Sequence, residues 1–243
     1  MEFAIEALAE DTLLLRFGEA IDLATNARVH AAARALRVAA LRGVVDIAPA
    51  YATLLVRFDP CTRSHEELAE ALRAATAETL DPGLRRDEES KHDSPPGAST
   101  GMVAIPVCYG GDHGPDLEAV AKHAELSPDE VTARHTAAEY TVAMIGFAPG
   151  FPYLLGLDPA LAMPRRADPR TRVPAGSVAI GGAQTGIYPR ELPGGWQLIG
   201  RTPLSLFDPA RAPPCLLAPG DRVRFRAIGR DEFAKLAGHT SGD

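Results

Sequence analysis

The sequence has little positive charge and no cluster of it. Its 25 Lys and Arg residues are outnumbered by 32 Asp and Glu residues, which leaves a formal net charge of −7. Nucleic-acid binding depends on phosphate neutralisation and needs a basic face. The composition therefore argues against nucleic acid as the main partner, and an anionic substrate would need local positive charge.

Long apolar runs are also missing. None reaches the roughly 18 residues of a membrane-spanning helix. The first residues, MEFAIEALAEDTLLLRF, carry acidic side chains where a signal peptide carries basic ones. We therefore expect a cytoplasmic protein with no membrane partner.

Cysteine is rare: Cys61, Cys108 and Cys215 are isolated, with no CxxC spacing. An odd number leaves one unpaired in any disulfide scheme, and the sequence predicts reduced, mostly buried thiols.

The usual motifs for self-sufficient catalysis are absent as well. Neither GxxxxGK[ST] nor GxGxxG occurs, and Ser177 lacks the GxSxG elbow of a serine hydrolase. His135 and Glu139 stand four apart, but a third ligand is missing and the text between them is not HExxH. We predict no metal site, and we expect His135 to be a hydrogen-bonded residue at a helix end.

What is present begins with alternating β-prone and helical runs in residues 1–80. Strands are predicted at 3–8, 12–17, 44–48 and 53–58. A helix is predicted over 22–41, ending near Gly43, and a second begins with Ser64 as its N-cap. The order ββαββα suits an open sandwich with helices over one face of an antiparallel sheet.

Residues 81–100 are dense in charge, Pro, Ser and Gly, which predicts a linker or mobile excursion. Residues 101–243 form the second predicted domain. It should open with a strand at 102–109 and continue with helices begun by Pro115 and by Ser127, where Glu130 stands at the capping-box position. A strand at 222–228 and a short helix at 231–236 should close it. The fold class is therefore α+β.

The stretch 140–202 holds most of the unusual residue choices. Gly and Pro are too dense for helices, but β-branched and aromatic runs return between them, which predicts short strands joined by tight turns in a barrel or sandwich. Its GGAQTG loop is either an anion-binding nest or a plain turn. Trp196 is either a core anchor or a pocket wall. Four arginines lie among prolines on an extended loop, where one or two could clamp a carboxylate or phosphate and the others would be solvated: Arg165, Arg166, Arg170 and Arg172.

Three segments of this stretch carry a resemblance to a known family: GFAPGFPYL, PRRADPRTRVPAGSVAIGGAQTGIYP and PGGWQLIGRT. They resemble the family that includes the B subunit of the bacterial ATP-dependent 5-oxoprolinase, subunit 1 of allophanate hydrolase and an inhibitor of a sporulation sensor kinase. The resemblance runs nearly end to end. It implies an amino-terminal α/β domain and a carboxy-terminal cyclophilin-like β-barrel, although the 81–100 segment looks longer than the family usually carries.

The resemblance implies amide chemistry. In 5-oxoprolinase, the B and C subunits act together with ATP on the lactam of 5-oxo-L-proline, and the A subunit opens the ring to L-glutamate. The amide oxygen becomes anionic and needs donors aimed at it, for which this sequence offers Gln184, Thr185 and Arg201 as catalytic residues. A flat cyclic amide also needs an apolar wall. The predicted substrate-binding residues are Phe147, Pro149, Gly150, Phe151, Arg172, Pro174, Gly181, Gly182, Tyr188 and Trp196.

Three functions stay open at this point. The chain is expected to be an oxoprolinase subunit that is inactive alone and whose site, with ATP, is completed by the C subunit in a direct heteromer. The alternatives are inhibition of a sensor histidine kinase and carboxyltransfer to a urea-like amide. The residues themselves do not separate the three.

Overall fold

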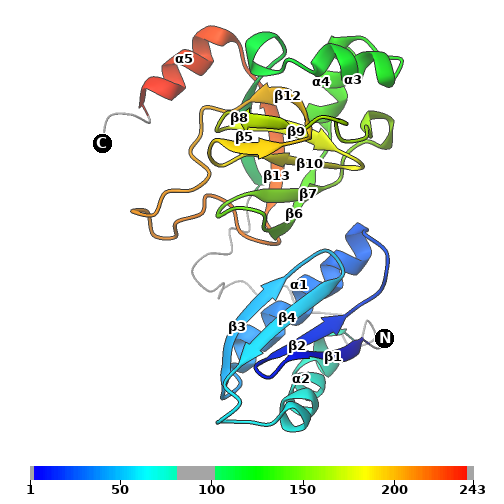
Figure 1. The fold of residues 1–243 in the computed structure, drawn as a ribbon, viewed down its shortest axis with the longest axis vertical. Helices are drawn as coiled ribbons and strands as arrows, with labels where there is room; N and C mark the ends of the chain where they lie inside the picture. The colour runs from blue at the N-terminus through cyan, green and yellow to red at the C-terminus, as the bar shows by residue number, and fades with distance from the viewer. Residues whose placement is uncertain (1–2, 81–101, 240–243) are drawn as a thin grey trace, which may run out of the picture. The chain divides into compact units, whose positions relative to one another are not determined.

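The computed structural model describes residues 3–80 and 102–239, and the chain divides into two compact units, 1–95 and 96–243 (Figure 1). The segment 81–100, predicted to be a linker or mobile excursion, lies outside the described residues. Each unit is described below by itself.

The amino-terminal unit has the predicted order ββαββα. Its four strands form one antiparallel sheet in the order β1-β2-β4-β3. One face of that sheet and both helices share a core that includes Leu15, Leu54 and Leu72. Its elements are β1 (Ala4–Ala9), β2 (Thr12–Arg16), α1 (Leu23–Ala39), β3 (Val44–Pro49), β4 (Thr53–Phe58) and α2 (His65–Leu80).

Helix α1 begins as the sequence indicates and ends earlier. Asp22 is its N-cap and accepts a hydrogen bond from the Thr25 amide at 2.8 Å. The helix stops at Ala39 because Ala40 takes the left-handed conformation, with φ 42°, and its amide bonds back to the Leu36 carbonyl. The expected end at Gly43 was therefore wrong: Gly43, at φ 86°, forms the turn into β3.

The carboxy-terminal unit is built on a closed barrel with the strand order β10-β7-β6-β13-β5-β12-β9. Strands β13 and β5 pair in parallel, and the other neighbours pair antiparallel. The α+β fold class and the barrel are thus confirmed. The elements are β5 (Met102–Tyr109), η1 (Gly111–His113), α3 (Leu117–His123), α4 (Pro128–Ala137), β6 (Tyr140–Ile145), β7 (Pro152–Leu155), η2 (Pro159–Leu161), β8 (Arg170–Val173), β9 (Ser177–Gly181), β10 (Gln184–Ile187), β11 (Leu192–Gly194), β12 (Gln197–Arg201), β13 (Arg222–Ala227) and α5 (Arg230–His239).

Helices α3 and α4 lie side by side next to the barrel (Figure 1). The capping box predicted for α4 is confirmed, since Ser127 and Glu130 exchange side-chain to backbone hydrogen bonds. Helix α3 begins at Leu117, so Pro115 is not its first residue. Asp116 stands at the N-cap, but its side chain makes no capping hydrogen bond because it is held by other partners, described below.

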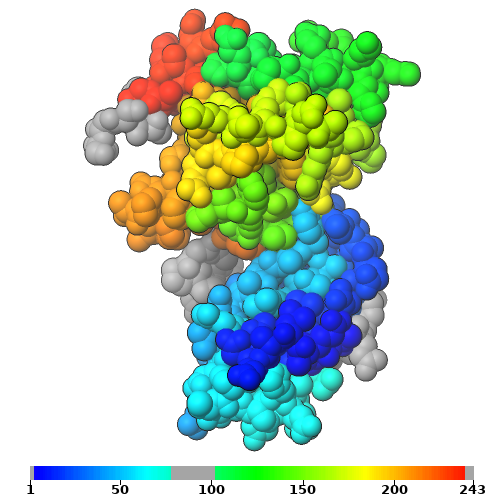
Figure 2. Space-filling view, in the orientation of Figure 1, coloured from blue at the N-terminus to red at the C-terminus, as the bar shows by residue number. Residues whose placement is uncertain are grey.

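The barrel strands separate two apolar clusters, one inside the barrel and one outside it. The interior is filled by aliphatic side chains such as Val107, Val178 and Ile199, all completely buried. Outside β9 and β12, a second apolar cluster lies between the barrel and the two-stranded sheet β11-β8. In Figure 2 the yellow-green segment that contains β8 and β9 forms much of the visible surface of this unit. The second cluster contains most of the aromatic residues named from the sequence.

The cysteines are free thiols, as expected, but they are not mostly buried. Only Cys108 is buried, whereas Cys61 is exposed and Cys215 is intermediate.

Candidate functional site

The four aromatic residues predicted as a wall form one cluster. The ring of Phe151 lies at its centre, with centroids 5.5 Å from Phe147, 5.1 Å from Tyr188 and 5.7 Å from Trp196, each at nearly a right angle. These edge-to-face contacts are a favoured geometry for aromatic rings. Phe151, Tyr188 and Trp196 are buried, so most of the cluster is a packed core on the outside of the barrel.

Glycines make room for these rings. A Cβ at Gly181 would lie 2.5 Å from the Trp196 ring, and one at Gly194 would overlap the Tyr188 hydroxyl. At Gly150 it would meet Phe207 at 2.7 Å. The glycines that the sequence assigns to ligand approach are therefore used largely for packing within the chain.

Phe147 differs from the other rings because it is exposed. Its side chain and backbone together are 61% exposed, and its φ of 64° is in the left-handed region that bulky residues rarely adopt. Such strain persists where the surroundings impose it and is common at binding sites. Phe147 is therefore the member of the predicted wall best placed to contact a ligand.

The structure separates two of the predicted oxyanion donors. Gln184 pairs with Gly181 at one end of β9, whereas Arg201 pairs with Ser177 at the other. Four residues of strand span about 13 Å. The Arg201 side chain extends further away still, because its Nε bonds the Ala175 carbonyl beyond the Ser177 end of β9, so Gln184 and Arg201 do not form a single donor set.

The backbone groups of Gly182, in the GGAQTG loop, are engaged within the chain. The Gly182 amide donates to the Met163 carbonyl at 2.8 Å, and the Met163 amide donates back at 3.1 Å. Gly182, at φ +66°, has open space around its Cα, but its polar groups are used in this bridge. This bridge makes the Gly182 backbone groups unavailable to a ligand.

Thr185 lies inside the barrel and is completely buried. Its hydroxyl donates to the Ala179 carbonyl at 3.0 Å, so it can only accept from His135 Nε2 at 3.1 Å. His135 Nδ1 in turn accepts from the Tyr109 hydroxyl at 2.7 Å. Thr185 thus belongs to a closed chain of buried hydrogen bonds, and its donor is not available to a substrate.

His135 is the hydrogen-bonded histidine that the sequence indicates, although it lies inside the barrel. Burial lowers the pKa of its imidazole from 6.5 to about 3, so it is neutral at physiological pH. Glu139 lies beyond the end of α4 and pairs with Arg222 and Arg224. Within residues 3–80 and 102–239, no group of three or more His, Cys, Asp and Glu side chains could hold a metal ion.

Sequence reasoning missed Asp116, the residue that organises the arginine-rich loop. It is buried and accepts two hydrogen bonds from Arg170, at 2.8 and 2.9 Å, one from Arg166 at 3.3 Å, and one from the Leu198 amide at 2.7 Å. The carboxylate that this loop clamps is therefore the chain's own. A lone Asp after Pro115 carried no signal of this role.

The other two arginines of the loop have different surroundings. The Arg165 guanidinium lies 5.8 Å from the Trp196 ring centroid, in a cation–π contact. Arg172 is 81% exposed and only loosely paired with Glu191, at 3.6 Å, and Pro174 is exposed next to the same strand. Pro149 is exposed beside Phe147 in the turn 146–151, where the Phe151 amide bonds to the Ala148 carbonyl.

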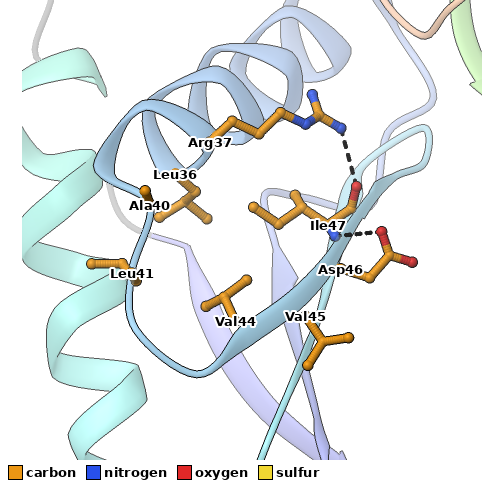
Figure 3. A pocket seen from close by; sticks show the side chains of 8 residues that line it. All are labelled: Leu36, Arg37, Ala40, Leu41, Val44, Val45, Asp46 and Ile47. Carbon is orange, nitrogen blue, oxygen red and sulfur yellow. Dashed lines mark hydrogen bonds between the residues drawn. The ribbon is translucent and has the colours of Figure 1, made fainter.

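The amino-terminal unit has an open groove of about 400 Å³ between α1 and β3 (Figure 3). It is lined by Leu36, Arg37, Ala40, Leu41, Val44, Val45, Asp46 and Ile47. β3 is an edge strand, but its Ile47 carbonyl accepts from Arg37 at 3.1 Å and its Ile47 amide donates to Asp46 at 2.8 Å. These bonds occupy the edge groups that a partner strand would use, and no residue predicted for the site lies in this groove.

No helix in the part of the chain that the structure describes combines the length and apolar composition needed to cross a membrane.

The chain is similar to several known proteins. The family "Carboxyltransferase domain, subdomain C and D" matches residues 3–217. The B subunit of 5-oxoprolinase from Bacillus subtilis (strain 168) is 43% identical over 96% of this chain and 96% of its own length, and that of Escherichia coli O157:H7 is 44% identical over 90% and 93%. The crystal structure of TTHA0988 superposes with a TM-score of 0.73 at 41% identity over 90% of this chain, which spans only 40% of that longer chain.

Proposed function

Because the chain belongs to the carboxyltransferase-domain family, subdomain C and D, we propose that it is the B subunit of an ATP-dependent 5-oxoprolinase. The observation that carries the proposal is the 43% identity to the B. subtilis B subunit, which extends over 96% of both chains. The reaction would open the lactam of 5-oxo-L-proline to L-glutamate.

We place the reacting lactam near the Ser177 end of β9. Phe147 is the exposed ring there, and Tyr188 approaches from the neighbouring strand, with its amide donating to the Ser177 carbonyl at 2.9 Å. Arg201 flanks Ser177 on the opposite side, in β12. Its Nε donates to the Ala175 carbonyl at 2.7 Å, which orients the guanidinium and leaves the terminal Nη groups for a ligand. Of the three predicted donors, Arg201 is the one that these surroundings favour.

ATP supplies the phosphoryl group that turns the amide oxygen into a leaving group. The sequence has no P-loop, so we propose that the nucleotide is bound with the help of the C subunit. This chain would contribute the aromatic surface and a cation close to the developing negative charge, a type of interaction worth on the order of 3 kcal/mol in other enzymes. Activity should then require the A, B and C subunits together, in the cytoplasm.

The test is reconstitution. Co-expressed with its C subunit, the chain should co-elute in size-exclusion chromatography, with an interface above about 1,000 Å². Glutamate should form from 5-oxoproline and ATP only when the A subunit is added. Arg201→Ala should lower turnover by at least about tenfold, while Gln184→Ala, at the other end of β9, serves as the comparison.

Four results would contradict the proposal. Turnover by the isolated chain would remove the need for a shared site, and failure to co-elute would favour an inhibitor of a histidine kinase. If the Arg201→Ala complex kept full activity, the lactam would have to bind elsewhere, for example at the Gly181 end of β9 next to Gln184. Equal losses of melting temperature and activity would indicate a structural role for Arg201.

Carboxyltransfer to a urea-like amide is a second candidate, favoured by the description of the matching family. In that reaction the amide nitrogen would receive CO2 from biotin, and no A subunit would be needed. Carboxylation of an amide nitrogen by the chain, given a biotin carboxylase and bicarbonate, would support it, and glutamate formation without biotin would contradict it.

A further inference from the structure

Two guanidinium groups of the carboxy-terminal unit lie together and have no carboxylate partner. Most arginines of this unit are paired: Arg134 with Asp158, Arg166 and Arg170 with Asp116, Arg172 with Glu191, Arg222 and Arg224 with Glu139, and Arg226 with Glu232. Five arginines of the unit form no such pair within the described residues: Arg165, Arg190, Arg201, Arg211 and Arg230. Of these, Arg201 and Arg230 both lie close enough to His113 to act on its charge. On a chain with a net charge of −7, arginines without carboxylates are informative when they lie near each other.

The barrel brings these two arginines to one place. Arg201 of β12 is the register partner of Cys108 in β5, and the chain then continues from Cys108 through Tyr109 into the Gly110–Gly111 turn. Arg230 lies against that turn, since a Cβ at Gly111 would be 2.5 Å from its Nη2. Two features favour glycine at position 111: the backbone has a positive φ of +53°, and a side chain there would collide with the Arg230 guanidinium.

His113 completes the group. Its ring lies 4.3 Å, centroid to centroid, from Phe233, which is three residues after Arg230 and so on the same side of α5. This contact holds the start of α5 against η1. Arg201, Arg230 and His113 thus converge from β12, α5 and η1, with Asp112 as the acidic neighbour of the imidazole.

From this convergence we infer that Arg201, Arg230 and His113 form a binding site for an oxyanion group, either a carboxylate or a phosphoryl group. Guanidinium groups suit both, because their planar N–H donors match two oxygens on one centre. The inference rests on the proposed function for its two sources: the carboxylate of 5-oxoproline and the phosphates of ATP. It goes beyond that function by adding Arg230 and His113, which are not among the catalytic or substrate-binding residues predicted above.

The imidazole should report occupancy of the site. Partial burial lowers the pKa of His113, and the positive charges of Arg201 and Arg230 lower it further, against the opposite effect of Asp112. A bound anion would offset the charges of both guanidiniums. The His113 pKa should therefore rise when the site is filled.

The experiment follows the His113 ring signals of the full chain by NMR across pH, without ligand and with each of four probes. The probes are 5-oxo-L-proline, its neutral carboxamide, ADP and inorganic phosphate. We expect the His113 pKa to rise with the oxyanion that belongs to the site, and not with the carboxamide. A response to 5-oxoproline but not to ADP or phosphate assigns the carboxylate, and the reverse assigns a phosphoryl group.

Variants separate this site from general charge effects. Arg230→Gln should weaken binding of the responding probe at least tenfold, and Gly111→Ala, whose Cβ would displace the Arg230 guanidinium, should do the same. Arg224→Gln removes an equal charge from an arginine that pairs with Glu139, opposite Ala104 at the far end of β5, and should bind normally. Melting temperatures confirm that each variant is folded.

The inference is overturned if no oxyanion raises the His113 pKa, if the carboxamide does so equally, or if Arg224→Gln weakens binding as much as Arg230→Gln. Because binding is measured on the isolated chain, its failure is distinct from failure of the reconstituted complex to form glutamate. If Arg230→Gln abolished both anion binding by the isolated chain and turnover by the complex, the anion site would be part of the catalytic site.

Discussion

The two units of this protein are stabilised in different ways. In the amino-terminal unit, residues 3–80 contain two glycines, and alternating apolar residues of β2 and β4 pack on two helices. In the carboxy-terminal unit, residues 102–239 contain sixteen glycines, and the barrel buries polar side chains of which Asp116 and His135 make the most bonds. Apolar packing of two helices on one sheet characterises the first unit, whereas in the second buried polar side chains such as Asp116 and His135 bond partners 50 or more residues away.

This difference indicates that the candidate binding site lies in the carboxy-terminal unit. Unusual residues in the second unit have partners far away in the chain. Arg201 bonds the Ala175 carbonyl, the Phe147 ring faces the Tyr188 ring, and Arg230 lies against Gly111. A site can be held rigidly by such contacts. The amino-terminal unit has a groove, but the edge groups of Ile47 are already bonded.

The sharpest way to test the comparison is to remove a buried charge from the second unit. Asp116→Ala leaves Arg166 and Arg170 without their shared carboxylate and the Leu198 amide without an acceptor. Breaking a buried pair in this way should lower the free energy of unfolding by about 3 kcal/mol. Urea denaturation followed by fluorescence of Trp196, the only tryptophan, measures it.

Glu6→Ala is the matched control in the first unit, because its pair with Arg16 is exposed. Its urea midpoint, followed by far-UV circular dichroism because Trp196 reports only the second unit, should stay unchanged. If both variants lose the same stability, the two units do not differ in the way described.

Acid should affect the second unit through His135. Its pKa is about 3 in the folded state and 6.5 otherwise, so below pH 6.5 the unfolded chain binds a proton that the folded chain does not. The stabilisation is complete above pH 6.5 and is lost as the pH falls, by about 3 kcal/mol at pH 4. Trp196 fluorescence during urea denaturation at a series of pH values measures this slope.

His135→Gln should flatten this pH dependence, although it lowers stability at pH 7. His65→Gln, which removes a half-buried histidine of the first unit, should keep the full slope. An unchanged slope in His135→Gln would mean that other groups cause the acid sensitivity.

The smallest expected effect is a difference in stability between alanine substitutions at two adjacent glycines, Gly181 and Gly182. Gly181→Ala should cost about 2 kcal/mol because its Cβ would meet the Trp196 ring, and overpacking is destabilising. Gly182→Ala meets nothing and should cost only about 1 kcal/mol for its left-handed backbone.

The Trp196 emission spectrum should shift in Gly181→Ala and stay constant in Gly182→Ala. A larger loss at Gly182 would indicate that its bridge to Met163 matters more than the packing at Gly181.

Local rules predicted much of the first unit and parts of the second. The order ββαββα, the Ser127 cap and the strand-rich stretch 140–202 follow from periodicity, capping residues and glycine content. The aromatic residues named from the sequence do form one cluster. The start of α3 and the end of α1 were missed, because one depended on the partners of Asp116 and the other on Ala40 taking a conformation that is rare for alanine.

The sequence by itself therefore determined the elements, the family and the residues with chemical potential. Only the tertiary structure decided which of those residues are available. Strand register placed Gln184 and Arg201 at opposite ends of β9, the barrel enclosed Thr185, and Asp116 took two of the four loop arginines. The physical reason is that periodicity and capping act over a few residues, whereas hydrogen-bond partners and register are set between segments far apart in the chain.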